Sequence, residues 1–211
     1  MFATVFFEHI ILEVPRTRIY RRLGYRRGVT EITDKRAAEV EKYISEALNL
    51  IRLRGTGRRL PLQDKNEAQI VLGGGTGDEV LQSRRLSRFF GECQEAVLMG
   101  ATAGHEIMAA IAEDTDGGHL TRGVVLDATA SEMVDAALDW IMSYFARVLR
   151  RERKALTEKR FSAGYGDFQL ENQQTMFRLL ELERIEVQIT ETFLLVPEKS
   201  VTALAGVKGF D

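Results

Sequence analysis

The stretch Arg160-Phe161-Ser162-Ala163-Gly164-Tyr165-Gly166-Asp167-Phe168 lies between two segments of helical pattern and has the composition of neither. Gly164 and Gly166 can adopt positive φ and allow a ligand to approach the backbone closely. Tyr165 adds a rigid ring with one hydroxyl, and the planar guanidinium of Arg160 can pair with a carboxylate. Two interpretations are open: a loop that grips a zwitterionic small molecule carrying an aromatic base, or a tight turn around a buried Tyr165.

The composition around this stretch describes a chain that can form one sizeable folded domain. Its 211 residues are 45% hydrophobic and 28% charged, which is ordinary for a globular protein with a substantial core. The net charge of −2 argues against a nucleic-acid partner, since such proteins usually carry a basic face. The single cysteine, Cys93, excludes an internal disulfide, and a reducing cytoplasm is the expected location. No His or Cys pair has the spacing of a metal site, so we expect no bound metal.

The N-terminal part reads as an arm followed by a helix. Residues 2–12 are apolar but too short to span a bilayer, so we expect a strand or a cover for the core and no membrane segment. The next segment is expected either to stay solvated while its apolar residues dock, or to meet an acidic partner. Its basic residues are Arg16, Arg18, Arg21, Arg22, Arg26 and Arg27. Thr33 then caps a helix that reaches Ile51, after which we expect Gly55-Thr56-Gly57 to end it and residues 58–65 to form a loop.

The middle of the chain alternates short apolar runs with glycine-rich turns. Residues 68–72 predict a strand, and the glycine-rich segment 73–77 follows it. Such a turn can cradle a phosphate, but this one lacks the Gly-Lys-Ser/Thr ending of a P-loop and the spacing of a dinucleotide fingerprint. We therefore interpret it as a link to a helix at residues 83–90. Residues 96–99 predict a second strand, and residues 106–112 predict a helix.

The last part of the chain determines the predicted fold class. The longest helix is expected to start at Leu126 and to run up to the central loop. After the loop we expect an amphipathic helix and then strands at residues 185–189, 193–196 and 201–207. Because helices and hairpins do not alternate strictly, we predict an α+β fold with a twisted, mostly antiparallel sheet and flanking helices.

Residues 160–168 are followed by Leu170-Glu171-Asn172-Gln173, a polar start to the next predicted helix. This segment resembles the Arg-x-x-Pro-Gly-Tyr loop and the following helix of one family, the activation (reactivation) domain of vitamin B12-dependent methionine synthase. Ile189-Thr190-Glu191-Thr192 and Val196-Pro197-Glu198-Lys199-Ser200-Val201-Thr202-Ala203 resemble its Leu-Thr-Glu-Ser…Pro-x-x-Ser-Val-Ser. Ala101-Thr102-Ala103-Gly104 and Leu126-Asp127-Ala128 resemble its Thr-Leu-Gly segment and the start of its long helix, and Arg22-Leu23-Gly24-Tyr25 resembles a motif of stand-alone relatives.

The resemblance implies that the chain binds S-adenosylmethionine and presents its methyl group to cobalamin held on a partner chain. The implied partners are a cobalamin-binding protein or methionine synthase modules on a separate chain, with a flavoprotein as electron donor. Such a reaction needs positioning rather than a general acid or base, so no catalytic side chain is expected. The residues that the resemblance assigns to ligand binding are Arg160, Ser162, Gly164, Tyr165, Glu191 and Asp135.

Each of these residues has an implied role. Arg160 would bind the ligand carboxylate, and Tyr165 would hydrogen-bond or stack. Ser162 would contribute backbone, and Gly164 would allow close approach. Glu191, expected to open a strand beside the loop, or Asp135 would face the ligand's ammonium or sulfonium.

The chain departs from the family where Ala163 replaces a proline and Ala205-Gly206 replaces an aromatic pair. We predict an N-terminal arm and helix over residues 1–60 and an activation-domain-like core over residues 61–211, together one compact unit. Two alternatives remain. One is a module that docks on a corrinoid protein without using S-adenosylmethionine. The other is an unrelated small-molecule enzyme with Tyr165 as acid and His105 or Asp167 as base.

Overall fold

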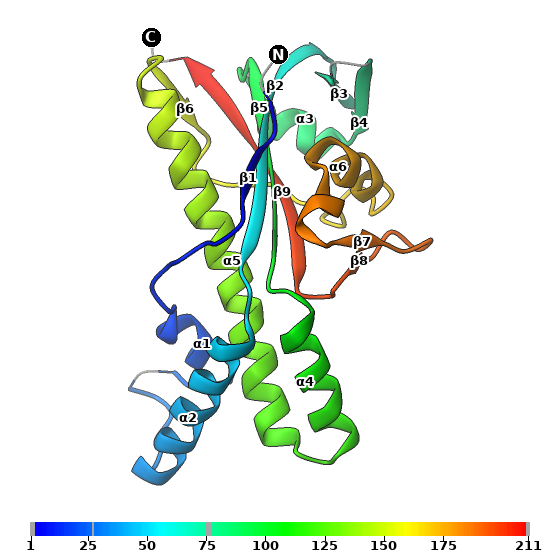
Figure 1. The fold of residues 1–211 in the computed structure, drawn as a ribbon. Coiled ribbons are helices and arrows are strands. Elements are labelled where there is room, and N and C mark those ends of the chain that lie inside the picture. The colour runs from blue at the N-terminus through cyan, green and yellow to red at the C-terminus, as the bar shows by residue number, and fades with distance from the viewer. Residues whose placement is uncertain (1–2, 27, 75–76, 210–211) are drawn as a thin grey trace.

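A computed structural model describes residues 3–26, 28–74 and 77–209 of the chain. Expectations that involve Phe2, Arg27, Gly75 and Thr76 lie outside these residues. The elements, in order, are β1 (Val5–Phe7), α1 (Arg16–Arg22), α2 (Asp34–Leu50), β2 (Arg54–Lys65), β3 (Gln69–Gly73), β4 (Asp78–Gln82), α3 (Arg84–Phe90), β5 (Glu95–Thr102), α4 (His105–Asp116), α5 (Leu120–Arg150), β6 (Lys154–Leu156), α6 (Asn172–Leu180), the 3-10 helix η1 (Leu182–Ile185), β7 (Gln188–Ile189), β8 (Leu195–Val196) and β9 (Ser200–Gly209) (Figure 1).

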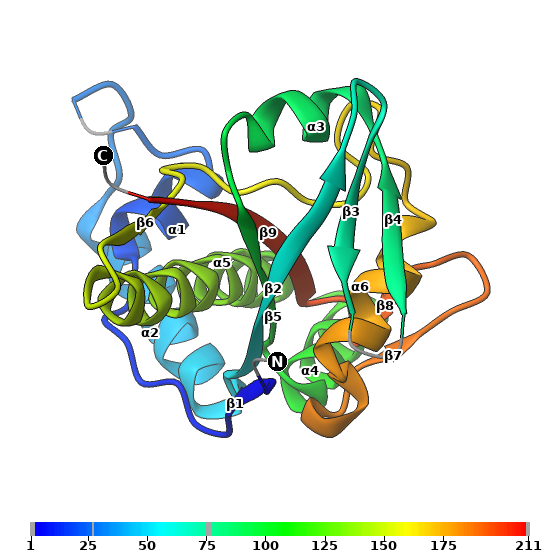
Figure 2. The same ribbon diagram turned by 90° about the horizontal axis from the view of Figure 1, so that it is seen from above.

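The strands form one large sheet in the order β4-β3-β2-β5-β9-β6, with β1 pairing to the first half of β2. Every pairing between these strands is antiparallel. β7 and β8 form a separate hairpin. Figure 2 shows the twist of the large sheet and helices on both of its faces. The predicted α+β class with a mostly antiparallel sheet is therefore confirmed.

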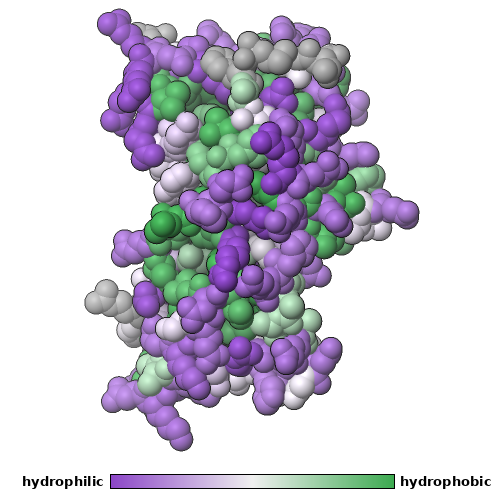
Figure 3. Space-filling model, viewed as in Figure 1, coloured by the Kyte–Doolittle hydropathy of each residue, from purple (hydrophilic) through white to green (hydrophobic). Residues whose placement is uncertain are grey.

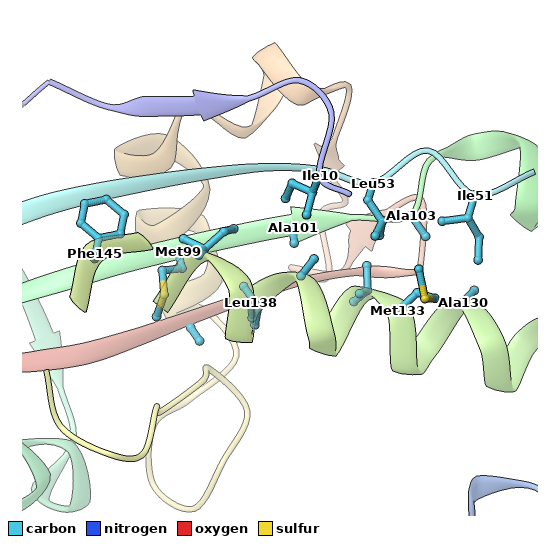
Figure 4. Close-up of a cluster of buried hydrophobic side chains, with 14 of the residues drawn as sticks. Ile10, Ile51, Leu53, Met99, Ala101, Ala103, Ala130, Met133, Leu138 and Phe145 are labelled. Atoms are coloured by element: carbon cyan, nitrogen blue, oxygen red, sulfur yellow. The ribbon is translucent and has the colours of Figure 1, made fainter. Parts of the chain in front are cut away.

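The core lies on both sides of the central strands, because side chains alternate between the two faces of a strand. On one face, Met99 and Ala101 of β5 and Leu138 of α5 belong to one buried cluster (Figure 4). Val97 of β5 and Ile141 of α5 are further members of this cluster. On the other face, a second buried cluster combines strand residues with α3, α6 and η1. β5 is buried at every position, so it forms the centre of a three-layer arrangement.

The predicted loop at residues 58–65 is wrong, because these residues belong to the long strand β2. Gly55 and Gly57, the expected helix stop, lie within the strand where α5 comes close. A Cβ added at Gly55 would lie 2.7 Å from Cδ1 of Ile141 and 3.0 Å from the backbone oxygen of Gly100. Glycine in a strand often marks such a close approach rather than a break.

Other boundaries also differ from expectation. The segment after β3 leads into β4 and not directly into α3, so β3 and β4 make a hairpin. α5 begins at Leu120, ahead of the expected Leu126. The predicted strand at residues 185–189 is shorter than expected: Ile185 ends η1, and only Gln188–Ile189 form the strand β7. Glu181 and Glu186, on either side of η1, both take a left-handed conformation that turns the chain. The predicted helix at residue 34 onward is confirmed, with the Thr33 side chain accepting a hydrogen bond from the Arg36 backbone N–H.

The N-terminal residues are attached to the rest of the molecule through both sheet and helix contacts. β1 pairs with β2, and β2 itself runs across residue 60. Three arginines of α1 form ion pairs with acids of the chain: Arg16 with Glu41, Arg18 with Asp139 and Arg22 with Glu132. Polar residues cover most of the surface in Figure 3, with smaller apolar patches between them. Among the described residues, none of the helices combines the length and the apolar character needed to cross a membrane.

Candidate functional site

The central loop is held in one shape by its own backbone. Gly164 and Gly166 have φ of +85° and +63°, which the sequence predicted from their lack of a Cβ. The Gly164 N–H donates to the Phe168 carbonyl at 2.8 Å, and the Phe168 N–H donates to the Tyr165 carbonyl at 3.0 Å. Phe168 is fully buried, and Phe161 forms an isolated bridge with Leu204 of β9. The loop is therefore anchored to the sheet at Phe161 and packed into the second buried cluster at Phe168.

Asp167 fixes the loop to a neighbouring helix. Its carboxylate accepts a hydrogen bond of 2.6 Å from the Ser83 hydroxyl and one of 2.8 Å from the Arg84 backbone N–H. The Ser83 hydrogen bond, followed by those of backbone N–H groups, lowers the pKa of Asp167 against a smaller opposing effect of desolvation. A carboxylate engaged in this way is a helix cap, which does not suit it to act as the base of the alternative enzyme.

A cavity of about 570 Å³ opens beside the loop, within the range typical of small-molecule sites. Residues from α5, the loop, α6 and the start of β9 meet here. They are Asp135, Arg160, Phe161, Ser162, Ala163, Tyr165, Leu170, Gln173, Ser200, Val201 and Thr202. Four residues assigned from the sequence thus converge on one cavity: Asp135, Arg160, Ser162 and Tyr165.

Tyr165 is 69% exposed, so the interpretation of a turn around a buried tyrosine is wrong. It lines the cavity between two glycines that both have positive φ. A ring in this position can stack on a ligand, and its hydroxyl forms no hydrogen bond within the described residues.

Arg160 is engaged by two carboxylates of α5. One guanidinium nitrogen, Nη1, donates to Oδ1 of Asp139, and the other, Nη2, lies 3.2 Å from Oδ1 of Asp135. The Arg160 side chain keeps 22% of its surface exposed, and the Asp135 side chain keeps 45%. The cavity wall thus contains a cation and an anion side by side, and Asp139 pairs with the same cation without lining the cavity.

Gln173 and Thr202 form a polar pair in the cavity lining, and neither residue is among those expected at the site. Thr202 Oγ1 donates to Oε1 of Gln173 at 2.9 Å, and both side chains are buried. The Nε2 group of Gln173 has no hydrogen-bond partner among the described residues, so it can donate to a bound molecule. Gln173 belongs to the segment 170–173 and Thr202 to the segment 196–203, both of which resemble family motifs. Membership in these segments is the sequence signal that could have assigned the two residues to the site.

The remaining assigned residues lie elsewhere. Glu191 does not open a strand beside the loop, because it lies in the turn between β7 and β8, outside the cavity lining. Gly164 lies next to the lining residues and shapes the loop. His105 begins α4, where its Nε2 lies 3.0 Å from the Glu186 carbonyl, and it lines a different cavity. Among the described residues, no group of three or more His, Cys, Asp or Glu side chains is placed to hold a metal ion.

The three-layer α+β arrangement, with a long helix across one sheet face, is the fold of a solved reactivation domain. A solved structure described as the MetH reactivation domain bound to AdoHcy superimposes with a TM-score of 0.62, covering 93% of this chain and 70% of that chain. The sequence identity is 16%, so the two proteins are similar in their fold. No family model matches the sequence, and no curated protein matches it.

Proposed function

We propose that the chain binds S-adenosylmethionine in the Arg160 cavity and acts as a reactivation component for a corrinoid-dependent methyltransferase, with cobalamin carried on another chain. The observation that supports this most is the convergence of Asp135, Arg160, Ser162 and Tyr165 on one cavity of about 570 Å³. The same fold occurs in a structure described as bound to AdoHcy.

The chemistry of the cavity suits a zwitterionic ligand with an aromatic base. Arg160 offers a planar fork for a carboxylate, and Asp135 offers an anion for an ammonium or sulfonium. The ring of Tyr165 offers a stacking surface, and Gln173 offers an amide donor. S-adenosylmethionine supplies a methyl group activated on a sulfonium, so these residues would only have to bind and orient it.

A ligand carboxylate that binds the Nη groups of Arg160 would replace one of their present contacts with Asp135 and Asp139. The contact with Asp135 is the more replaceable one, because it has a length of 3.2 Å and its carboxylate is 45% exposed. Exposed pairs of this kind contribute about 0–1 kcal/mol. The ligand carboxylate would take the place of Asp135 on Nη2, which releases Asp135 toward the ligand's cation.

The test is calorimetric titration of the purified chain with S-adenosylmethionine and S-adenosylhomocysteine. Arg160→Ala should weaken binding about tenfold or more, as expected for loss of a hydrogen bond to a charged group. Arg178→Ala is a matched control, because Arg178 is an exposed α6 arginine that pairs with Glu79 away from the cavity. No binding by the wild-type chain, or equal losses in both variants, would contradict the proposal.

A second candidate is a module that docks on a corrinoid protein without using S-adenosylmethionine. The engagement of Arg160 by both Asp135 and Asp139 favours it, since the arginine already has its charge balanced. It predicts binding to a cobalamin-loaded partner that is unchanged by Arg160→Ala and by added S-adenosylhomocysteine. Under the first proposal, the ligand and the partner should each alter binding of the other.

A further inference from the structure

The N-terminal helix α1 is connected to the cavity through one shared carboxylate. Arg18 of α1 donates from Nη1 and Nη2 to Oδ2 of Asp139, at 2.9 and 2.8 Å. The other oxygen of Asp139, Oδ1, accepts from Nη1 of Arg160. Arg18 and Arg160 are thus two cations on the two oxygens of the same acid.

The position of Arg18 is fixed by packing and not by this contact alone. Its neighbour Ile19 is fully buried, in a cluster with Val40, Ile44, Val125 and Ala128. α1 therefore stays on the surface of α2 and α5 when a single ion pair is removed. A substitution of Arg18 therefore removes the positive charge of its side chain while α1 keeps its position.

We infer that Arg18 is a positioning residue for the cavity: through Asp139 it determines how strongly Arg160 is held, and so how well the cavity accepts a ligand carboxylate. The identity of the ligand rests on the function proposed above, whereas the link between Arg18 and Arg160 does not. Because Arg18 and Arg160 share the carboxylate of Asp139, the N-terminal helix has a role in the site. Arg18 itself does not line the cavity.

The sign of the effect follows from the charges around Arg160. Asp135 and Asp139 together carry two negative charges beside one guanidinium, and a ligand carboxylate would add a third. The positive charge of Arg18 on Asp139 offsets this excess. Without Arg18, Asp139 acts on Arg160 alone, and the electrostatic potential at the carboxylate position becomes less favourable for an anion.

α1 also provides a matched control. Arg22 lies one helical turn further along and pairs with Glu132 of α5 at 2.7 Å. The side chains of Arg18 and Arg22 are 43% and 45% exposed, so the two substitutions remove similar surface charges. Arg22 does not contact Asp139, and its loss should leave Arg160 as it is.

The first measurement uses the ligand-free chain. The side-chain Nε–Hε resonance of Arg160 and the rotation rate of its guanidinium group are followed by NMR in the wild type, Arg18→Gln and Arg22→Gln. Arg18→Gln should shift the resonance and slow the rotation, because Asp139 then holds Arg160 alone. Arg22→Gln should match the wild type. If both variants match the wild type, or both change it equally, the inference is overturned.

The second measurement is titration with S-adenosylhomocysteine and with methylthioadenosine, which lacks the amino acid part. Arg18→Gln should weaken S-adenosylhomocysteine about two- to fivefold and leave methylthioadenosine unchanged. Equal affinities of the three proteins for S-adenosylhomocysteine would overturn the role in ligand binding. If none of them binds it while the Arg160 resonance responds to Arg18→Gln alone, the proposed function fails and the link stands.

Discussion

The carboxylate of Asp167 and the hydroxyl of Ser83 lie 2.6 Å apart in a hydrogen bond that joins the central loop to the first turn of α3. Ser83 is also the N-cap of this helix, since its hydroxyl accepts from the Leu86 N–H at 2.9 Å. This pair of side chains therefore accepts hydrogen bonds from the free backbone N–H groups in the first turn of α3. It also holds in place the edge of the loop that carries Tyr165.

Asp167→Ala should lower the thermal stability of the chain and weaken ligand binding through the loop. The pKa of Asp167 is lowered in the folded state, so its contribution to stability is complete above the usual aspartate value of about 3.9 and disappears as the pH falls through the lower folded value. The Tm difference between wild type and variant should therefore shrink below about pH 4. A difference independent of pH between 2 and 6 would contradict this role.

Glu95→Ala should destabilise the chain by about 3 kcal/mol, because it removes one of the carboxylates that balance the buried positive charge of Arg59. Arg59, whose side chain is 4% exposed, donates from Nη2 to Glu95 at 2.9 Å, and Glu152 and Lys154 complete the cluster. Chemical denaturation gives the free energy of unfolding. The exposed pair Arg36–Glu39 supplies the control, since Glu39→Ala should cost less than about 1 kcal/mol.

The same cluster adds a pH dependence to stability. Burial raises the pKa of Glu95, but the hydrogen bonds from Arg59 and Lys154 outweigh it and leave the pKa below its usual value. The contribution is thus present above about pH 4.3, the usual glutamate value, and is lost on acidification through the folded pKa. Unfolding curves of Glu95→Ala should show a weaker acid dependence than those of the wild type.

Gly55→Ala should cost about 1–3 kcal/mol through overpacking against α5. The new methyl group would meet Ile141 at 2.7 Å and the immobile Gly100 carbonyl oxygen at 3.0 Å. Gly209→Ala, at the end of β9, is the control, because nothing lies within 4 Å of a Cβ there. Equal free energies of unfolding in the two variants would show that the contact between β2 and α5 is looser than described.

Thr202→Val should destabilise the fold by about 1–3 kcal/mol, because Oε1 of buried Gln173 then lacks its donor. Adding Gln173→Leu should restore much of that loss, since replacing both partners with apolar groups removes the unpaired atom. A double-mutant cycle by denaturation measures this coupling. The double variant should nevertheless bind S-adenosylhomocysteine more weakly, because the amide donor at the cavity is gone.

Tyr165→Ala should separate binding from stability. The ring is 69% exposed, so its removal should change the free energy of unfolding by no more than about 0.5 kcal/mol. Loss of a stacking partner should weaken S-adenosylhomocysteine about two- to tenfold, and Tyr165→Phe should retain most of the affinity. A large loss of stability would instead assign the ring a structural role.

The parts of the fold that follow from local pattern were predicted from the sequence. Helices α2 and α6 have the expected periodicity, and β3 and β5 are the expected apolar runs. β2 was missed because glycine normally interrupts a strand, and only the distant helix α5 explains why it is needed here. η1 was missed because the alternation of Ile185, Val187 and Ile189 fits a strand, although the left-handed Glu186 turns the chain between them.

The candidate site was predicted to a similar extent. The loop motif identified Arg160, Ser162 and Tyr165, and they line one cavity as residues of a single short segment would. The partners of Arg160 could not be chosen from sequence, since several acids of α5 are spaced by about one turn. The expectation that Glu191 opens a strand is wrong for a related reason: the position of this residue depends on where the β7–β8 hairpin turns, which the local sequence does not determine.

The complete burial of β5 has a consequence for how such a protein can diverge. Replacements in that strand must conserve volume on two opposed surfaces at once, which few mutations do. Exposed positions of the cavity margin, such as Tyr165, are free of this restriction. Selection can therefore alter what the molecule binds there while the framework stays intact, even as overall sequence identity drifts to a low level.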